Sequence, residues 1–388
     1  MRPATSLDRL GTETAFEVLA RAKKLEAQGR RVIHLEIGEP DAPTPPHIVE
    51  AGIRALRDGH TTYCPSAGLP ELRHACADYM GSLRGISVDP DHVLIAPGAK
   101  PFIFFGILAT CDPGDEVIYP DPGFPIYESV IRWAGAVPVP LPLREDHGFG
   151  FTKEDLASRL TPQTKLVIIN SPGNPTGGVI AADALDGVAD VLREHPCWIL
   201  SDEVYAELLH DRDHETLTSR AGFLDRTILM DSFSKTFAMT GWRLGYAAVP
   251  PTLVEPITKL LVNSVSCTPP ATQLAGLAAL QGPREALDGM RETFRRRREV
   301  LVSGLNELPG VRCAMPEGAF YAFPNVSGTG YDADVLARAL LEESGIALLS
   351  GSAFGAEGRG HWRLSYATSL EDIEAALEVM QRFLEARC

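Results

Sequence analysis

Hydrophobic and polar positions follow two different spacings along this chain, and each spacing predicts a different element. Residues 14–29 (TAFEVLARAKKLEAQG) repeat apolar positions at helical intervals, and Gly29 marks the expected end of that helix. Residues 31–41 (RVIHLEIGEPD) predict a short strand that leads into a turn. From about residue 47, helical segments alternate with short apolar runs at 92–98, 115–123, 164–177, 197–203 and 226–235.

This alternation predicts an α/β fold in which helices cover a mostly parallel sheet. We expect the large domain to span residues 47–284. The last third of the chain has a different pattern, with short strands expected in 310–326 and 361–367 and helices in 332–345 and 370–386. We therefore expect a smaller α+β domain built from both termini, residues 1–46 and 285–388.

Small, polar or turn-forming residues follow each of the apolar runs. In open α/β sheets, ligands bind beyond the carboxyl ends of the strands. The sequence therefore predicts that the side chains after these runs meet at one edge of the sheet: Gly98, Ala99, Lys100, Phe124, Asn174, Asp202 and the segment from Ser232 to Lys235.

Composition narrows the choice of partners. The 388 residues include 36 basic and 51 acidic side chains, for a net charge of -15, and 45% of all residues are hydrophobic. These values are typical of a globular enzyme, and an acidic surface repels phosphate backbones and anionic lipids. We expect neither nucleic acid nor membrane as a partner. The basic run at 294–299 (FRRRRE), flanked by Glu292, predicts a solvated helix face with salt bridges.

The cysteines and the N-terminus bear on the cellular compartment. Seven scattered cysteines without a Cys-x-x-Cys pair favour reduced thiols and a cytoplasmic protein. Asp8, Glu13 and Glu17 interrupt the region where a signal peptide would need an apolar core, and the apolar run at 101–111 is too short to span a bilayer. The histidine spacing matches no common metal motif, so we expect no metal site.

One lysine, Lys235, lies among small hydroxyl residues and is followed by an arginine, Arg243. Nearby cations and partial burial lower the pKa of a lysine and free its amine to form a Schiff base. The hydroxyls of Ser232 and Ser234, together with the guanidinium, suit a phosphate. Asp202 ends an apolar strand and suits a ring N–H. These groups match the requirements of pyridoxal 5′-phosphate.

The motifs around these residues resemble those of the class I aminotransferases, most of all the bacterial aspartate aminotransferase branch. The resemblance covers nearly the whole chain and rests on YCPSAGLPELR (63–73), NSPGNPTGG (170–178), SDEVY (201–205), SFSKTFAMTGWRLGY (232–246) and GAFY (318–321). It implies a pyridoxal-phosphate transferase fold, a homodimer, and ping-pong transfer of an amino group between an L-amino acid and a 2-oxo acid such as 2-oxoglutarate.

The resemblance also implies roles for individual residues. Lys235 matches the Schiff-base lysine that also moves the substrate proton, and Asp202 matches the partner of the ring nitrogen. Tyr205 and Asn174 match the hydrogen-bond donors to the ring 3-oxygen, and the asparagine also borders the substrate. The phosphate ligands would be the hydroxyls of Ser232 and Ser234, the guanidinium of Arg243, and backbone groups of Gly98, Ala99 and Lys100.

Four further positions carry implied roles. Phe124 stands where an aromatic ring stacks on the cofactor, although the family more often has Trp or Tyr there. Tyr63 matches a tyrosine that reaches the phosphate of the neighbouring subunit. Arg363 matches the arginine that binds the substrate α-carboxylate, with the backbone N–H of Gly38 beside it.

Substrate choice stays open between two interpretations of Lys100. Its ammonium either pairs with the second carboxylate of aspartate or glutamate, or only adds positive potential near the phosphate. Glu13, at a position where the family has a hydroxyl residue, would repel a second carboxylate or favour a cationic or neutral side chain, and Phe124 and Ile37 suit apolar donors. Two rival functions also remain: a lyase, decarboxylase or racemase with the same cofactor, and a non-catalytic sensing domain of a transcription regulator.

Overall fold

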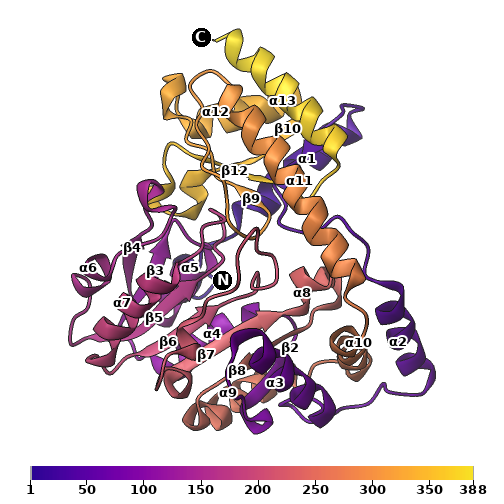
Figure 1. Ribbon diagram of the computed structural model, residues 1–388, viewed down its shortest axis with the longest axis vertical. Coiled ribbons are helices and arrows are strands. Elements are labelled where there is room, and N and C mark those ends of the chain that lie inside the picture. The colour runs from indigo at the N-terminus through magenta and orange to yellow at the C-terminus, as the bar shows by residue number, and fades with distance from the viewer. Residues whose placement is uncertain (1, 388) are drawn as a thin grey trace.

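A seven-stranded sheet crosses the broad lower part of the computed structural model, which describes residues 2–387 (Figure 1). The strand order is β2-β8-β7-β6-β5-β3-β4, and β8 pairs antiparallel with both neighbours while the other pairings are parallel. The strands are β2 (Val93–Ala96), β3 (Glu116–Asp121), β4 (Val137–Pro142), β5 (Thr164–Asn170), β6 (Trp198–Asp202), β7 (Thr227–Ser232) and β8 (Gly245–Ala248). The mostly parallel, helix-covered sheet predicted from the sequence is confirmed.

Both faces of this sheet are buried, which explains why its strands are nearly continuous apolar runs. On β5, Leu166 and Ile168 pack into the core formed with α4, α5 and α9, while Val167 and Ile169 pack into the core formed with α6 and α7. The helices of this part of the chain are α2 (Pro46–Arg57), α3 (Pro70–Arg84), α4 (Lys100–Thr110), α5 (Ile126–Ala134), α6 (Lys153–Ala157), α7 (Ala182–Arg193), α8 (Phe233–Thr236), α9 (Pro251–Val265) and α10 (Pro270–Gln281).

The upper part of the molecule in Figure 1 joins the N-terminal region to the last third of the chain. Strand β1 pairs parallel with β10, and β11-β12-β9 form an antiparallel sheet. The strands are β1 (Ile33–His34), β9 (Tyr321–Ala322), β10 (Ile346–Ala347), β11 (Leu349–Ser350) and β12 (Trp362–Ser365). The helices are α1 (Thr14–Ala27), α11 (Glu285–Glu307), α12 (Ala333–Ala339) and α13 (Leu370–Glu385). Leu35 shares one core with residues of α11 and α13, and we propose that the small domain comprises 1–46 and 285–388.

Two strands of the large sheet were missed in the sequence, for different reasons. The edge strand β4 has the sequence VPVPLP, and its prolines hid a strand that an edge position tolerates. The strand β8 is GYAA, whose small residues lack a β-branched signal. Gly245 needs to be small, because a Cβ there would lie 2.4 Å from the backbone nitrogen of Ala99.

The predicted solvated face of α11 is correct in part. Arg295 pairs with Glu292 and Glu299 on the surface, as expected. Arg298 is instead buried, donates to the carbonyl of Pro316 and pairs with Asp211, so this position was wrongly assigned to solvent. Within residues 2–387, no helix combines the length and apolarity that crossing a bilayer requires.

Candidate active site

The carboxyl ends of the parallel strands border a cavity of about 530 Å³. Residues from α1, from the β1 loop and from β12 complete its wall. The structure brings twelve of the predicted site residues into this lining: Gly38, Ala99, Lys100, Phe124, Asn174, Asp202, Tyr205, Ser232, Ser234, Lys235, Arg243 and Arg363. Most of the residues that follow the apolar runs therefore border one cavity, as the strand-end argument predicted, although Gly98 does not line it.

Lys235 lies on the short helix α8, directly after β7, and its ammonium donates a hydrogen bond to the carbonyl of Gly38. Burial lowers the pKa of Lys235 to about 8. Glu39 acts in the opposite direction, while the positive charges of Arg363, Arg243 and Lys100 lower the pKa further. The amine can therefore exchange a proton near neutral pH.

Asp202 ends β6 inside the protein, and its carboxylate accepts a hydrogen bond of 2.6 Å from the Tyr127 hydroxyl. Burial raises the pKa of Asp202 to about 6, with the hydrogen bond from Tyr127 opposing the shift and the negative charges of Asp231 and Glu203 adding to it. Tyr127, on α5, was not predicted as a site residue because its partner is 75 positions away in the sequence. A buried aspartate with a raised pKa suits a cationic ring N–H as its partner.

Two tyrosine hydroxyls meet beside the cavity. The hydroxyls of Tyr205 and Tyr321 lie 2.7 Å apart, and burial raises the pKa of Tyr205 well above its usual value. Tyr321 lies in the quoted GAFY motif, but no role was predicted for it. Gly38 is crowded by this pair, since a Cβ there would lie 2.1 Å from the Tyr321 oxygen. Nearby, the buried Oδ1 of Asn174 has no hydrogen-bond partner among the described residues.

The other end of the cavity gathers groups that suit a phosphate. Helix α4 begins at Lys100 and presents its first backbone N–H groups, and Ser232 and Ser234 lie at the start of α8. The Ser232 hydroxyl already accepts from the Ser234 backbone N–H at 3.0 Å. Arg243 adopts a left-handed backbone (φ 54°) and its guanidinium lies against Gly98, where a Cβ would be 2.2 Å from Nη2. Gly98 therefore supports the cation without lining the cavity itself.

Arg363 is a buried cation in the cavity wall. It comes from β12, donates to the carbonyl of Glu36, and its Cζ lies 4.6 Å from the ring centre of Tyr321 and 5.3 Å from that of Phe354. Its Nε has no hydrogen-bond partner among residues 2–387, and burial lowers its pKa. A guanidinium with an unused donor in a cavity wall can bind a carboxylate.

Lys100 and Glu13 form a salt bridge with each other within the cavity lining. The Lys100 ammonium also lies 5.4 Å from the centre of the Phe124 ring. Phe124 contacts Tyr127 edge-on at 5.8 Å. The sequence analysis related both Lys100 and Glu13 to substrate choice, but it did not predict that they pair with each other.

Tyr63 differs from the other candidates because it does not line the cavity. Its side chain is 87% exposed, on the loop before α3. One chain therefore does not bring Tyr63 to the site that the other residues form.

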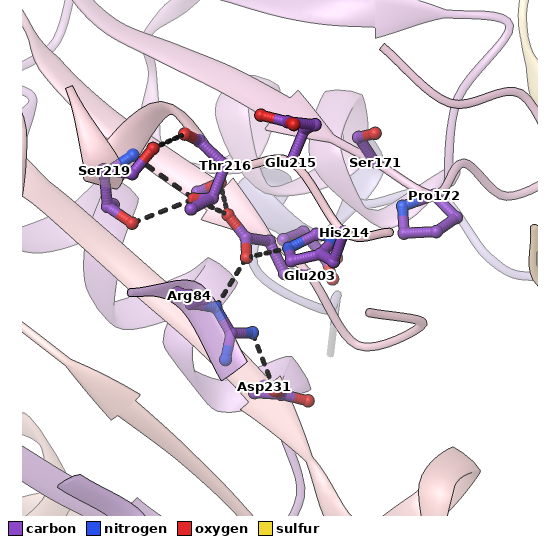
Figure 2. A network of polar contacts seen from close by, with 12 residues as sticks. Arg84, Ser171, Pro172, Glu203, His214, Glu215, Thr216, Ser219 and Asp231 are labelled. Atoms are coloured by element: carbon purple, nitrogen blue, oxygen red, sulfur yellow. Dashed lines mark hydrogen bonds and ion pairs between the residues drawn. The ribbon is translucent and has the colours of Figure 1, made fainter. Parts of the chain in front are cut away.

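A buried ionic network lies beneath the strand ends (Figure 2). Arg84, at the end of α3, donates from Nε to Glu203 at 2.7 Å and from Nη2 to Asp231 at 2.8 Å. Glu203 also accepts from Ser201 and Thr216 and contacts His214. Burial would raise the pKa of Glu203, yet Arg84 and His214 lower it to about 2. The network thus connects the end of β6 with β7 next to Asp202, and it was not predicted from the sequence.

The residues in the cavity fit pyridoxal 5′-phosphate. The close Gly98–Arg243 contact and the opposite pKa shifts of Lys235 and Asp202 each match a part of that molecule. Within the described part of the chain, no group of three or more His, Cys, Asp or Glu residues is arranged to hold a metal ion.

Comparison with known proteins agrees with this chemistry. The model of the family "Aminotransferase class I and II" matches residues 30–380. An aspartate/prephenate aminotransferase of Cereibacter sphaeroides is 39% identical, with 97% of each chain covered.

Two solved structures are similar over almost the entire chain. The aspartate aminotransferase of Rhizobium meliloti has a TM-score of 0.95 at 34% identity, covering 99% of both chains. An aromatic aminotransferase of Pyrococcus horikoshii has a TM-score of 0.90 at 40% identity, covering 92% of this chain and 96% of that one. The chain belongs to the class I and II aminotransferases, a family of pyridoxal-phosphate-dependent enzymes, within its aspartate/prephenate/aromatic branch.

Proposed function

We propose that this enzyme moves an amino group between an L-amino acid and a 2-oxo acid, with pyridoxal 5′-phosphate held in the cavity described above. The observation that carries the proposal is that one cavity wall contains Lys235, Asp202, Arg243 and Arg363. Arg243 with Ser232, Ser234 and the start of α4 would hold the phosphate. Asp202 would hold the ring nitrogen, and Asn174 and Tyr205 would hold the ring 3-oxygen.

The cofactor, when bound, supplies an electron-withdrawing ring that makes the Cα–H bond of the amino acid acidic. Lys235 takes the proton from Cα, for which a pKa of about 8 is suitable. Arg363 binds the α-carboxylate and so fixes which Cα bond faces the lysine. Tyr127 donates to Asp202 and keeps that carboxylate oriented. Phe124 and Tyr321 form apolar walls that limit the entry of water.

The identity of the donor depends on Lys100. A free Lys100 ammonium would suit the second carboxylate of aspartate or glutamate, and the names of several relatives include aspartate. The acceptor would be a 2-oxo acid such as 2-oxoglutarate.

Borohydride reduction of the holoenzyme tests the proposal most directly. Reduction should couple the cofactor covalently to the peptide that contains Lys235, and a donor panel should change the cofactor absorbance in single turnovers. Lys235→Ala should abolish both results, while Lys259→Ala, on helix α9, should leave both intact. Coupling to another lysine, or no absorbance change with any amino acid, would contradict the proposal.

We also propose that the active form is a homodimer in which Tyr63 reaches the partner's site. The support is the exposed position of Tyr63 outside its own cavity, together with the family resemblance. Mixing inactive Tyr63→Ala and Lys235→Ala subunits should restore some activity, because a hybrid dimer has one intact site. A fully active monomer, or mixtures that stay inactive despite subunit exchange, would exclude shared sites.

A further inference from the structure

The pair formed by Glu13 and Lys100 changes the charge available to a substrate side chain. Glu13 precedes the first residue of α1, and Lys100 is the first residue of α4, so two distant segments meet across the cavity. Their salt bridge is partly screened from solvent, with 19% of the Glu13 side chain and 40% of the Lys100 side chain exposed. An ion pair at such a position competes directly with any charged group on the substrate.

The other cations of the cavity lining, and the carboxylate of Asp202, already have tasks under the proposed function, while the remaining carboxylate, that of Glu39, accepts a hydrogen bond from Thr240. Arg363 faces the α-carboxylate, Arg243 the phosphate, Lys235 the reacting carbon and Asp202 the ring nitrogen. Among the described residues that line the cavity, Lys100 is the cation left for a second carboxylate, and Glu13 neutralises it. The Glu13–Lys100 pair therefore presents no net charge to the substrate side chain.

Several large apolar side chains form another part of the cavity wall. Ile37, Phe124 and Leu349 line the cavity, and Phe16 lines it with 60% of its surface exposed. A large apolar side chain exposed at the cavity wall gains free energy when another apolar group covers it. The substrate side chain is the group that would cover Phe16 in each reaction cycle.

We propose that Glu13 is a specificity-determining residue that occupies Lys100 and thereby selects amino acids with uncharged, apolar side chains over aspartate and glutamate. This inference rests on the proposed aminotransferase function. A second substrate carboxylate would have to displace Glu13 from Lys100 and leave two carboxylates close together, whereas an aliphatic or aromatic side chain leaves the pair intact. Glu13 also lies close enough to Arg363 for its charge to act on that guanidinium.

Donor half-reactions of the holoenzyme, followed by cofactor absorbance without any acceptor, test the inference. For the wild type, kcat/KM should be higher for phenylalanine or leucine than for aspartate or glutamate. Glu13→Gln keeps the size of the side chain but removes its charge and should raise the ratio of acidic to apolar kcat/KM at least about tenfold, or ~1.4 kcal/mol. Glu17→Gln, on the same helix but exposed and outside the lining, should leave the ratio within about twofold of wild type.

Binding provides a readout that does not depend on turnover. Succinate should bind Glu13→Gln at least about tenfold more tightly than it binds wild type, while 3-phenylpropionate should not gain affinity. The double variant Glu13→Gln/Lys100→Met should lose the gain for succinate, because the freed ammonium is its source.

A wild-type preference for acidic donors that Glu13→Gln leaves unchanged or weakens would overturn the inference and leave the aminotransferase proposal intact. Failure of every donor, together with failure of borohydride to label Lys235, would instead overturn the function itself.

Discussion

Asp202 and Glu203 are adjacent and both buried, yet their pKa values are shifted in opposite directions. Asp202 has its pKa raised to about 6 by burial, whereas Arg84 and His214 overcome burial and lower the pKa of Glu203 to about 2. The difference comes from partners, since Glu203 faces a guanidinium and an imidazole while Asp202 faces a neutral phenol. Burial alone therefore does not distinguish a structural charge from a functional one; the lack of a counter-charge does.

The same contrast separates two of the buried arginines, Arg84 and Arg363. Arg84 donates to both Glu203 and Asp231, with 0% of its side chain exposed (Figure 2). Arg363 donates to one backbone carbonyl, and its Nε lacks a partner within residues 2–387. Each of the two arginines keeps one buried nitrogen without a partner in this part of the chain, so the difference lies in the counter-charge. Arg84 pairs with two buried carboxylates and contributes to stability, whereas Arg363 pairs with no carboxylate among the described residues and is available for an anionic ligand.

Removing Arg84, the arginine that pairs with two carboxylates, should have the largest effect on stability. Arg84→Met leaves Glu203 and Asp231 buried without their cation, which should cost about 3–5 kcal/mol in the free energy of unfolding. Urea denaturation measures this cost. The matched control is Arg132→Met, which removes the exposed pair with Glu128 and should cost less than about 1 kcal/mol. A loss under about 1 kcal/mol for the Arg84 variant would contradict the assigned role.

Removing the charge of Asp202 should instead stabilise the cofactor-free protein. The folded pKa is raised from 3.8 to about 6, so wild type is destabilised as pH rises through about 6. Asp202→Asn should therefore be more stable at pH 8 by about 3 kcal/mol, and the gain should vanish below about pH 4. Urea denaturation at both pH values tests this.

In the holoenzyme, the same variant should be harmful, because it lowers activity. Asp202→Asn should lose at least about tenfold in kcat, because the charge that holds the ring proton is gone. Equal stability of the two cofactor-free proteins at pH 8 would show that Asp202 has a counter-charge after all.

The smallest of these effects should come from Arg363. Arg363→Lys keeps the charge but loses the planar pair of donors that matches a carboxylate, so KM for donor and acceptor should both rise at least about tenfold. Cofactor affinity, measured by titration, should stay within about threefold, since the proposed partner of Arg363 is the substrate α-carboxylate and not the phosphate. A change confined to cofactor affinity would place this arginine among the phosphate ligands instead.

The sequence was informative wherever function follows the order of strands. Lys235, Asp202 and Asn174 each follow an apolar run, and parallel strands end at one edge, so their meeting could be predicted. Tyr127, Tyr321 and Arg84 could not be found this way. Their partners are 75, 116 and 119 positions distant, and nothing local marks a phenol or guanidinium as bound across that separation.

The pairing of Glu13 with Lys100 escaped prediction for a related reason. Each residue was recognised as relevant to specificity, but the N-terminal segment has no regular register with the sheet from which a contact could be deduced. In the fold, β4 and β8 were missed because proline and small residues conceal a strand that neighbouring strands complete. The local sequence pattern predicts most helices and strands, while contacts between distant segments determine the strands and side-chain pairs that the pattern misses.

The crowding of Gly38 limits how this cavity can be re-engineered. Any Cβ at position 38 would overlap the Tyr321 hydroxyl, which in turn contacts Tyr205, and the Gly38 carbonyl accepts from Lys235. A combinatorial library aimed at new substrates should therefore keep Gly38 constant and diversify Glu13, Phe16 and Ile37. Single substitutions at those three positions change the cavity wall without replacing a contact of Lys235. Successive rounds of selection can therefore proceed through active variants.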